Sequence, residues 1–513
     1  SSNTAVGRMS LYTNSTGASN TAVGLNALFA NTTGSYNTAV GYAALDTATT
    51  ADSNLAIGYA SLQANTIGNN NTAVGREALY TNVAADRNVA LGYRSLYTMS
   101  RSTTADTYNV GVGNESLYSL TTGAFNTAIG GKALYTATTS DGNTAVGYNA
   151  ANALTTGTGN VALGAAAAYG ITTGSANTAL GVNTLYNNNA GSCTAVGYSA
   201  LGWASGANNT AVGSNCSENI TTGAKNTAVG KSALATLTTG NENVAMGESA
   251  MLNATTSYDS VVIGFEAGKA LTTAHSNTIV GQQAGLTITT GSDNVIIGDA
   301  AAVAGATKCV IVGQAACINL PEDELVAIGY NALNAATTGA TYNTAIGHRA
   351  LASLTTGTRN VALGWEAGVN LTTANRCTII GQNAAQGTLT GDDNVIIGRE
   401  AGYDITSGGT NTSLGNYSLQ NTTTGSSNVA IGMEALQANT TASYNTAVGY
   451  KALEANTTAS ENTAIGYNAL TKNTTGTGHV AVGFEALKET TTGDANTAVG
   501  YEALRNNTTA ANK

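Results

Sequence analysis

The chain has 513 residues, a formal net charge of −10 and only 9% charged residues, together with 62 glycines and one proline. The acidic balance argues against a nucleic-acid partner, because phosphate backbones select basic surfaces. A membrane-spanning helix needs about 18 consecutive apolar residues. No apolar run in the sequence comes near this length, so we expect no membrane insertion.

One short phrase recurs from end to end. The hexapeptide NTAVGY stands at 37–42, 143–148, 445–450 and 496–501, with close variants between these sites. Its glycine occurs 30 times, and 23 of the 29 intervals between occurrences are 17 residues long. A period this short predicts a repeat architecture instead of several globular domains. We therefore predict a single continuous solenoid over 1–513, irregular near 93–112 and 299–347, where the interval changes.

One repeat reads N-T-A-V-G-Y-x-A-L-x-x-x-T-T-G-x-x, and we number its positions 1 to 17 from the asparagine. Positions 2 to 4 are β-branched, small and aliphatic, and positions 8 and 9 are a small residue and usually leucine, which predicts two very short strands. Positions 6 and 7 vary freely, which predicts exposure to solvent, and the remaining residues are typical of turns. No helical apolar period is present. The predicted fold class is all-β, a parallel β-solenoid (β-roll) of about thirty 17-residue coils.

Positions 3 and 9 exchange volume. Position 3 is Ala, Gly or Ser in 24 repeats, and in the other six it is Val or Ile while position 9 becomes small. These six pairs are Val262–Gly268, Ile279–Gly285, Ile296–Ala302, Ile311–Cys317, Ile379–Ala385 and Ile396–Gly402. Because close-packed interiors penalise both voids and overfilling, we expect the two positions to share one part of the core.

Position 4 is aliphatic in every repeat. Side chains alternate along a strand, so positions 2 and 4 face outward if position 3 faces the core. A long row of exposed aliphatic side chains requires a cover, and identical chains around a symmetry axis supply one. We therefore expect a homo-oligomer whose interface includes Val40, Val146, Val229, Ile297 and Val448.

The cysteines and histidines do not form a chemical motif. Cys193, Cys309 and Cys377 take position 1, Cys216 position 8 and Cys317 position 9, and none belongs to a C-x-x-C pair. We expect small buried thiols. The three histidines occupy three different positions, and no nucleophile–base pair or carboxylate pair recurs. We therefore expect no enzymatic activity, no catalytic residue, no cofactor and no metal.

The asparagine of position 1 and the acidic segment at 321–324 are two polar features with specific structural interpretations. The asparagine of position 1 is expected to form a ladder that satisfies backbone groups of the turns. The acidic segment PEDE at 321–324 lies in the irregular stretch. It is either a solvated turn, which we favour, or a loop that binds a cation or a partner.

Two rows of side chains suggest binding surfaces. Tyrosines at position 6 are candidates for stacking on sugars, namely Tyr42, Tyr59, Tyr93, Tyr148, Tyr198, Tyr450, Tyr467 and Tyr501. The alternative is that these rings merely cover their neighbours. Threonine pairs at positions 13 and 14 would form rows that could bind ice, but the rows are interrupted, for example at Asn82 and Val83.

The phrase NTAVGYxAL, with variants such as NVAIG at 428–432, resembles the head repeats of YadA-like trimeric autotransporter adhesins. Its longer repeat, rich in NTAVGY and TTG, is similar to those of phage tail-fibre proteins. The resemblance implies a homotrimeric, extracellular, cell-surface or virion-associated fibre with an adhesive or structural role, and it names no ligand. Besides the chain itself, the partner that we expect is a cell-surface glycan or receptor. The alternative function is an ice-binding or self-assembling extracellular filament protein.

Overall fold

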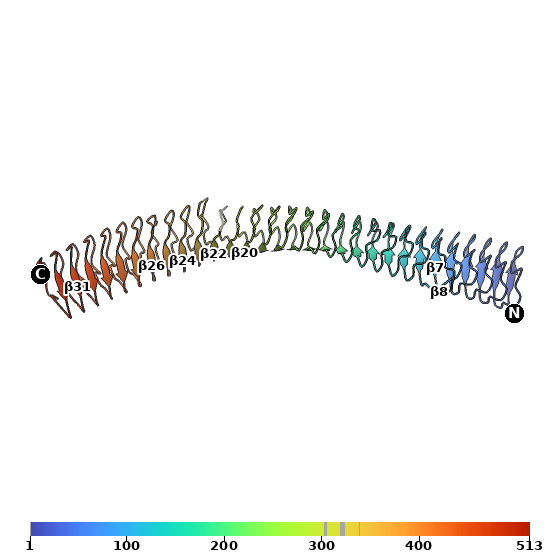
Figure 1. The fold of residues 1–513 in the computed structure, drawn as a ribbon, viewed down its shortest axis with the longest axis horizontal. Helices are drawn as coiled ribbons and strands as arrows, with labels where there is room; N and C mark the ends of the chain where they lie inside the picture. Colours follow the sequence, from blue (N-terminus) through green and yellow to red (C-terminus); the bar gives the residue numbers. More distant parts are fainter. Residues whose placement is uncertain (1, 302–304, 319–323, 338) are drawn as a thin grey trace. The chain divides into compact units, whose positions relative to one another are not determined.

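The computed structural model describes residues 2–301, 305–318, 324–337 and 339–513, and this part of the chain contains strands and turns without a helix. The chain divides into two compact units, Ser1–Tyr258 and Asp259–Lys513. Each unit is a parallel β-solenoid, as predicted, in which every repeat adds one coil with one short strand of the main sheet (Figure 1). In the described residues no helix is long and apolar enough to cross a membrane.

The strands of the first unit are β1 (Thr4–Val6), β2 (Thr21–Val23), β3 (Thr38–Val40), β4 (Leu55–Ile57), β5 (Thr72–Val74), β6 (Ala85–Asp86), β7 (Val89–Leu91), β8 (Ala105–Asp106), β9 (Val110–Val112), β10 (Thr127–Ile129), β11 (Thr144–Val146), β12 (Val161–Leu163), β13 (Thr178–Leu180), β14 (Thr194–Val196), β15 (Thr210–Val212), β16 (Thr227–Val229) and β17 (Val244–Met246). Those of the second unit are β18 (Val261–Ile263), β19 (Thr278–Val280), β20 (Val295–Ile297), β21 (Val310–Val312), β22 (Val326–Ile328), β23 (Thr344–Ile346), β24 (Val361–Leu363), β25 (Thr378–Ile380), β26 (Val395–Ile397), β27 (Thr412–Leu414), β28 (Val429–Ile431), β29 (Thr446–Val448), β30 (Thr463–Ile465), β31 (Val480–Val482) and β32 (Thr497–Val499).

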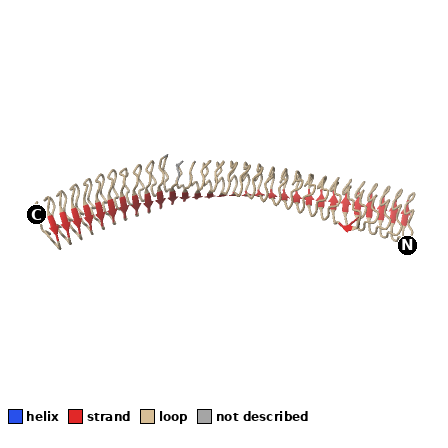
Figure 2. Cartoon of the chain, viewed as in Figure 1, coloured by secondary structure: helices blue, strands red, loops and turns tan. Residues whose placement is uncertain are grey.

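The strands occupy positions 2 to 4 of the repeat and lie on one side of the coils, and turns complete each coil (Figure 2). Neighbouring strands pair in register, so that Ala39 of β3 lies opposite Ala56 of β4. The predicted second strand at positions 8 and 9 is wrong. Ala43 and Leu45, at positions 7 and 9, both have a left-handed backbone with φ of 51°. Left-handed residues two apart fold the chain into consecutive turns, so this side of the coil is not extended.

The glycine of position 5 is required where neighbouring coils approach most closely. Gly41 has a φ of 137°, and a Cβ placed on it would lie 2.4 Å from the carbonyl oxygen of Gly58 in the next coil. Any side chain would therefore separate the two backbones. This close approach explains why the fifth letter of the phrase never changes.

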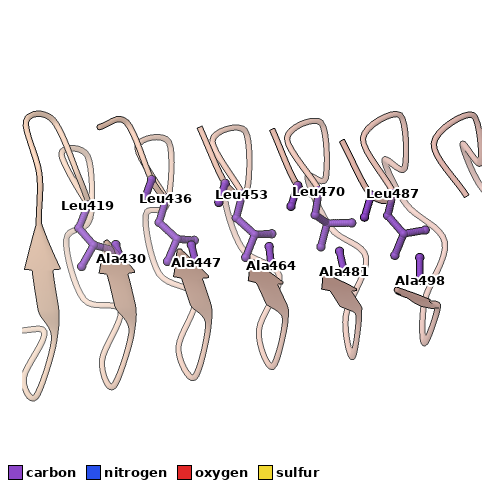
Figure 3. Close-up of a cluster of buried hydrophobic side chains, with 14 residues drawn as sticks. Leu419, Ala430, Leu436, Ala447, Leu453, Ala464, Leu470, Ala481, Leu487 and Ala498 are labelled. Carbon is purple, nitrogen blue, oxygen red and sulfur yellow. The ribbon is translucent and has the colours of Figure 1, made fainter. Parts of the chain in front are cut away.

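The core of each coil contains positions 3 and 9, as predicted. Figure 3 shows leucines of position 9, such as Leu436, packed beside alanines of position 3, such as Ala447, in the second unit. A Cβ placed on Gly285 would lie 3.1 Å from Cδ1 of Ile279. The two positions therefore share space, which confirms the volume exchange. Ala302, one of the predicted partners, lies outside the described residues.

Position 12 fills the same core, which the sequence analysis missed. A Cβ placed on Gly268 would lie 2.7 Å from Cδ1 of Leu271, at position 12 of the same coil. Position 12 is large in the four repeats where positions 3 and 9 are both small. These are the coils with Ala151 and Leu154, Ala168 and Ile171, Ser217 and Ile220, and Gly368 and Leu371. Three positions, not two, therefore share the space inside the coil.

The predicted asparagine ladder is present. Asn37 donates from Nδ2 to the carbonyl of Ala51 in its own coil, at 2.7 Å, and its Oδ1 accepts the backbone N–H of Asn54 in the next coil, at 2.9 Å. A second ladder forms where position 12 is asparagine, since Asn82 donates from Nδ2 to Oδ1 of Asn65 and to the carbonyl of Ala85, both at 3.0 Å. These bonds satisfy buried backbone groups that the short strands leave unpaired.

At the irregular stretch near 93–112, the chain forms a longer loop outside the main sheet. The interval from Gly92 to Gly113 is 21 residues, and the extra residues form β8, which pairs with β6 outside the main sheet. The main ladder continues directly from β7 to β9, where Val89 lies opposite Val110. An insertion in the turns therefore leaves the core in register.

Candidate interaction surfaces

The outer face of the main sheet carries positions 2 and 4. Ala128, at position 3, is fully buried, whereas Ile129, at position 4, is 41% exposed. Met246 of the first unit and Ile465 of the second are each 40% exposed. This alternation confirms that positions 2 and 4 point away from the coil's own core.

This outer sheet face is uncharged, and its position 4 is aliphatic in every coil. The strands of the main sheet in the described part contain no charged residue, and position 2 is either threonine or an aliphatic residue such as Val161, which is 41% exposed. Among the predicted interface residues, Ile297 is 40% exposed. Val40, Val146, Val229 and Val448 are half-buried on the same face. Each unit therefore carries a continuous aliphatic row, larger than the scattered apolar side chains normal on a soluble surface.

The position-6 tyrosines form stacked rows. Tyr42 and Tyr59 have ring centroids 5.1 Å apart and planes within 8°, and Tyr450 stacks on Tyr467 at 5.2 Å. Tyr501, which is 74% exposed, stacks on Phe484 at 5.1 Å. Stacked rings cover each other's faces, and a sugar needs an open face. The stacking therefore supports the alternative that these tyrosines cover their neighbours.

The remaining position-6 candidates lie in other surroundings. The guanidinium groups of Arg76 and Arg94 lie 5.9 and 5.0 Å from the ring centroid of Tyr93. Tyr148 and Tyr198 are 63% and 55% exposed, and within the described residues neither has an aromatic neighbour. These two keep the most open ring faces of the predicted set.

Position 10 carries a second aromatic row that the sequence analysis missed. In the first unit, Tyr80, Tyr97, Tyr118 and Tyr135 stack in succession at 5.1 to 5.2 Å. The signal was visible in the sequence, since tyrosines recur one repeat apart at this position. The row is accompanied by ion pairs between coils.

One such ion pair joins Glu77 and Arg94 at position 7 of successive coils. Arg94 Nε lies 2.6 Å from Glu77 Oε2, and this bond lowers the pKa of Glu77. Glu77 is only 7% exposed, and Ala43 and Ala60 at position 7 of other coils are 2% exposed. The prediction that position 7 faces solvent is therefore wrong for these coils, because the left-handed turn directs the side chain against the neighbouring coil.

The threonines of position 13 serve the solenoid itself. The hydroxyl of Thr32 donates to the carbonyl of Thr49 in the next coil at 3.0 Å, and Thr49 donates likewise to Thr66 at 3.2 Å. The hydroxyl hydrogens of these threonines are therefore already donated to the next coil. The adjacent position-14 threonines, such as Thr33 and Thr50, are exposed.

The five cysteines are all buried, as predicted. Burial penalises the thiolate and raises the pKa of Cys216 to about 11, which makes this thiol a poor nucleophile. His348 stacks between Tyr330 and Trp365, whereas His479 takes the asparagine's place at position 1. Over the described ranges, no group of three His, Cys, Asp or Glu residues could hold a metal ion.

The acidic segment PEDE lies largely beyond what the structure describes. Residues 321–323 are outside the described residues. Glu324 lies 3.4 Å from Nζ of Lys308 in an exposed ion pair.

Comparison with protein-family models and with curated protein sequences identifies no related protein. The fold itself defines the class: each unit is a parallel β-solenoid repeat protein.

Proposed function

We propose that the chain is a structural and adhesive fibre segment, a rigid extracellular or virion-associated shaft or head, in which identical chains pack through the outer sheet face. The observation that supports this is the uncharged sheet face with its aliphatic row at position 4. Side chains such as Ile297 are still 40% exposed. Covering them contributes part of the roughly 1.5–3 kcal/mol of full burial, and every coil repeats this part.

A closed cyclic oligomer suits such a row. Cyclic symmetry places the same face of each chain around one axis, so no copy leaves an unpaired aliphatic row. The resemblance of the repeats to trimeric adhesin heads favours three chains. Rigidity follows from the coil-to-coil ladders, which hold every repeat to the next through bonds such as Asn37 to Asn54.

Replacing two valines of the row by aspartate tests the proposal. Val146→Asp with Val229→Asp should dissociate or unfold the assembly, because the two charges would be buried without partners. The matched control, Tyr148→Asp with Lys231→Asp, places the same charges at position 6 and should leave the assembly intact. Multi-angle light scattering measures both. A well-folded, monodisperse wild-type monomer would refute the oligomer.

Adhesion is tested separately on the intact chain by glycan-array and cell-binding assays. The ice-binding alternative has weaker support, because the position-13 hydroxyl donors already bond within the protein. An ice-recrystallisation assay decides that alternative, and inhibition at low protein concentration would favour it over adhesion.

A further inference from the structure

A surface cavity of about 260 Å³ lies in the first unit, away from the outer sheet face. Its lining residues are Asn183, Tyr186, Ser199, Gly202, Trp203 and Glu218. They occupy positions 7, 10 and 11 of three successive coils, whereas the sheet face consists of positions 2 and 4. A ligand in this cavity would therefore not compete with the proposed oligomer contact.

The cavity exists because a glycine interrupts an aromatic row. Tyr169 and Tyr186 stack at position 10 with centroids 5.1 Å apart and planes within 9°. The next residue in this row is Gly202, which has no side chain to continue the stack. Trp203 meets Tyr186 only edge-on, at 61° and 6.3 Å. The ring of Tyr186 thus borders an open space of side-chain size.

Glu218 lines the cavity on the side opposite Tyr186, and no cation pairs with its carboxylate among the described residues. Glu218 takes position 10 in the coil after Gly202, and its Oε2 accepts a hydrogen bond from Asn215 Nδ2 at 2.9 Å. None of the six lining residues is cationic. The position-7 residues beside it, Asn183 and Ser199, are neutral.

Elsewhere the same solenoid brings a cation into contact with both a tyrosine ring and a carboxylate. Arg94 lies 5.2 Å from the ring centroid of Tyr97 and pairs with Glu77 at 2.6 Å. Lys451 likewise lies 5.6 Å from the ring centroid of Tyr450 and pairs with Glu434 at 2.9 Å. At the cavity the ring and the carboxylate are both present, and the cation is missing.

We propose that this cavity binds a guanidinium-type organic cation supplied from outside the chain, stacked on Tyr186 and ion-paired with Glu218. A guanidinium group is planar, so it can stack in the position of the missing ring, and its N–H groups match a carboxylate in pairs. The chain's net charge of −10 favours the approach of a cation.

Tryptophan fluorescence can report binding directly. The chain has two tryptophans, so Trp365→Phe leaves Trp203 in the cavity wall as the only one. Titration of this variant with N-acetyl-argininamide should change the Trp203 emission saturably. Adding Glu218→Gln, which keeps the shape and removes the charge, should weaken binding by about tenfold or more.

Filling the cavity is a second, independent test. A Cβ placed on Gly202 would have its nearest contact at 3.5 Å, which is ordinary packing, so Gly202→Tyr should fold and complete the row. This variant should not bind N-acetyl-argininamide. Circular dichroism verifies that it folds, and Glu218→Gln decides the question if it does not.

The outcomes separate the proposal from its rivals. Methylguanidinium binding as tightly as N-acetyl-argininamide would support a small-cation site, whereas much tighter binding of an arginine-containing peptide would support docking of a protein side chain. The proposal is overturned if Trp203 does not respond, if Glu218→Gln binds equally well, or if methyl glucoside binds as tightly as the cation.

Discussion

At the scale of single residues, His479 shows how a substitution is absorbed by the position-1 ladder. Its backbone N–H donates to Oδ1 of Asn462 at 2.9 Å, and its Nδ1 accepts the N–H of Asn496 at 3.2 Å. Nδ1 accepts only while it carries no proton. The side chain is fully buried, and this burial lowers its pKa. The ladder therefore continues through a neutral imidazole.

This arrangement predicts pH-dependent stability of the coils around His479. In the unfolded chain His479 takes up a proton near pH ~6.5, whereas the folded state resists protonation to a lower pH. The unfolded state then binds more protons, so stability is full above pH ~6.5 and falls as the pH drops toward the folded pKa. Hydrogen exchange of residues 462–513, corrected for intrinsic rates, should show faster opening at the lower pH.

His479→Asn restores the repeat's usual residue and is the matched control. It should remove the component of opening that titrates between the two pKa values. An unchanged pH dependence in this variant would assign the effect to nearby carboxylates, of which Asp494 is one.

At the scale of the coil, a three-residue strand has little stability by itself, and the core at positions 3, 9 and 12 supplies the rest. In one coil of the second unit, Ile396, Gly402 and Ile405 occupy these positions, with a Cβ on Gly402 placed 3.2 Å from Ile396 Cδ1 and 2.8 Å from Ile405 Cδ1. In the first unit, Ala228, Leu234 and Leu237 fill the same three positions, and all are fully buried. The two combinations are alternative ways to fill equal space.

Exchanging one combination for the other should therefore be tolerated only as a pair. Ile396→Ala leaves a void and should cost about 2–4 kcal/mol, and Gly402→Leu alone overfills the coil and should cost about 1–3 kcal/mol. The double variant should recover much of both losses. Hydrogen exchange of the strand β26 measures the local free energy of opening. Additive losses in the double variant would show that the positions do not share space.

At the scale of the whole molecule, each coil bonds mainly to the coils before and after it, as Asn37 does to Asn54. Stability in such a solenoid is a sum over neighbouring pairs. The chain should therefore tolerate loss of one complete repeat wherever its flanking coils still match.

Deletion of residues 428–444, one 17-residue repeat, joins position 17 to position 1 and should preserve the fold of the second unit. Deletion of 428–435 alone removes β28 and leaves 436–444 as a partial coil without a strand, and it should disrupt the neighbouring coils. Circular dichroism and the exchange pattern of the flanking coils compare the two. Equal damage by both deletions would show that coupling reaches beyond neighbouring coils.

Much of the fold could be derived from the sequence by itself. A strict 17-residue period requires identical coils to stack in register, so the parallel sheet, the asparagine ladder and the outward direction of position 4 follow from local pattern alone. The shared volume of positions 3 and 9 could also be predicted from the sequence. Within one chain, position 9 is small wherever position 3 is large, as in the pair Ile279 and Gly285.

Only the tertiary structure decided how each coil closes. The left-handed backbone at Ala43 and Leu45 makes positions 7 to 9 a run of turns, although their residue types suit a strand equally well. Closure also brings position 12 into the core, stacks the tyrosine faces, and leaves the gap at Gly202 between Tyr186 and Glu218. These features depend on contacts between residues in different coils, and a repeat pattern specifies which positions recur without specifying which side chains meet across the coil.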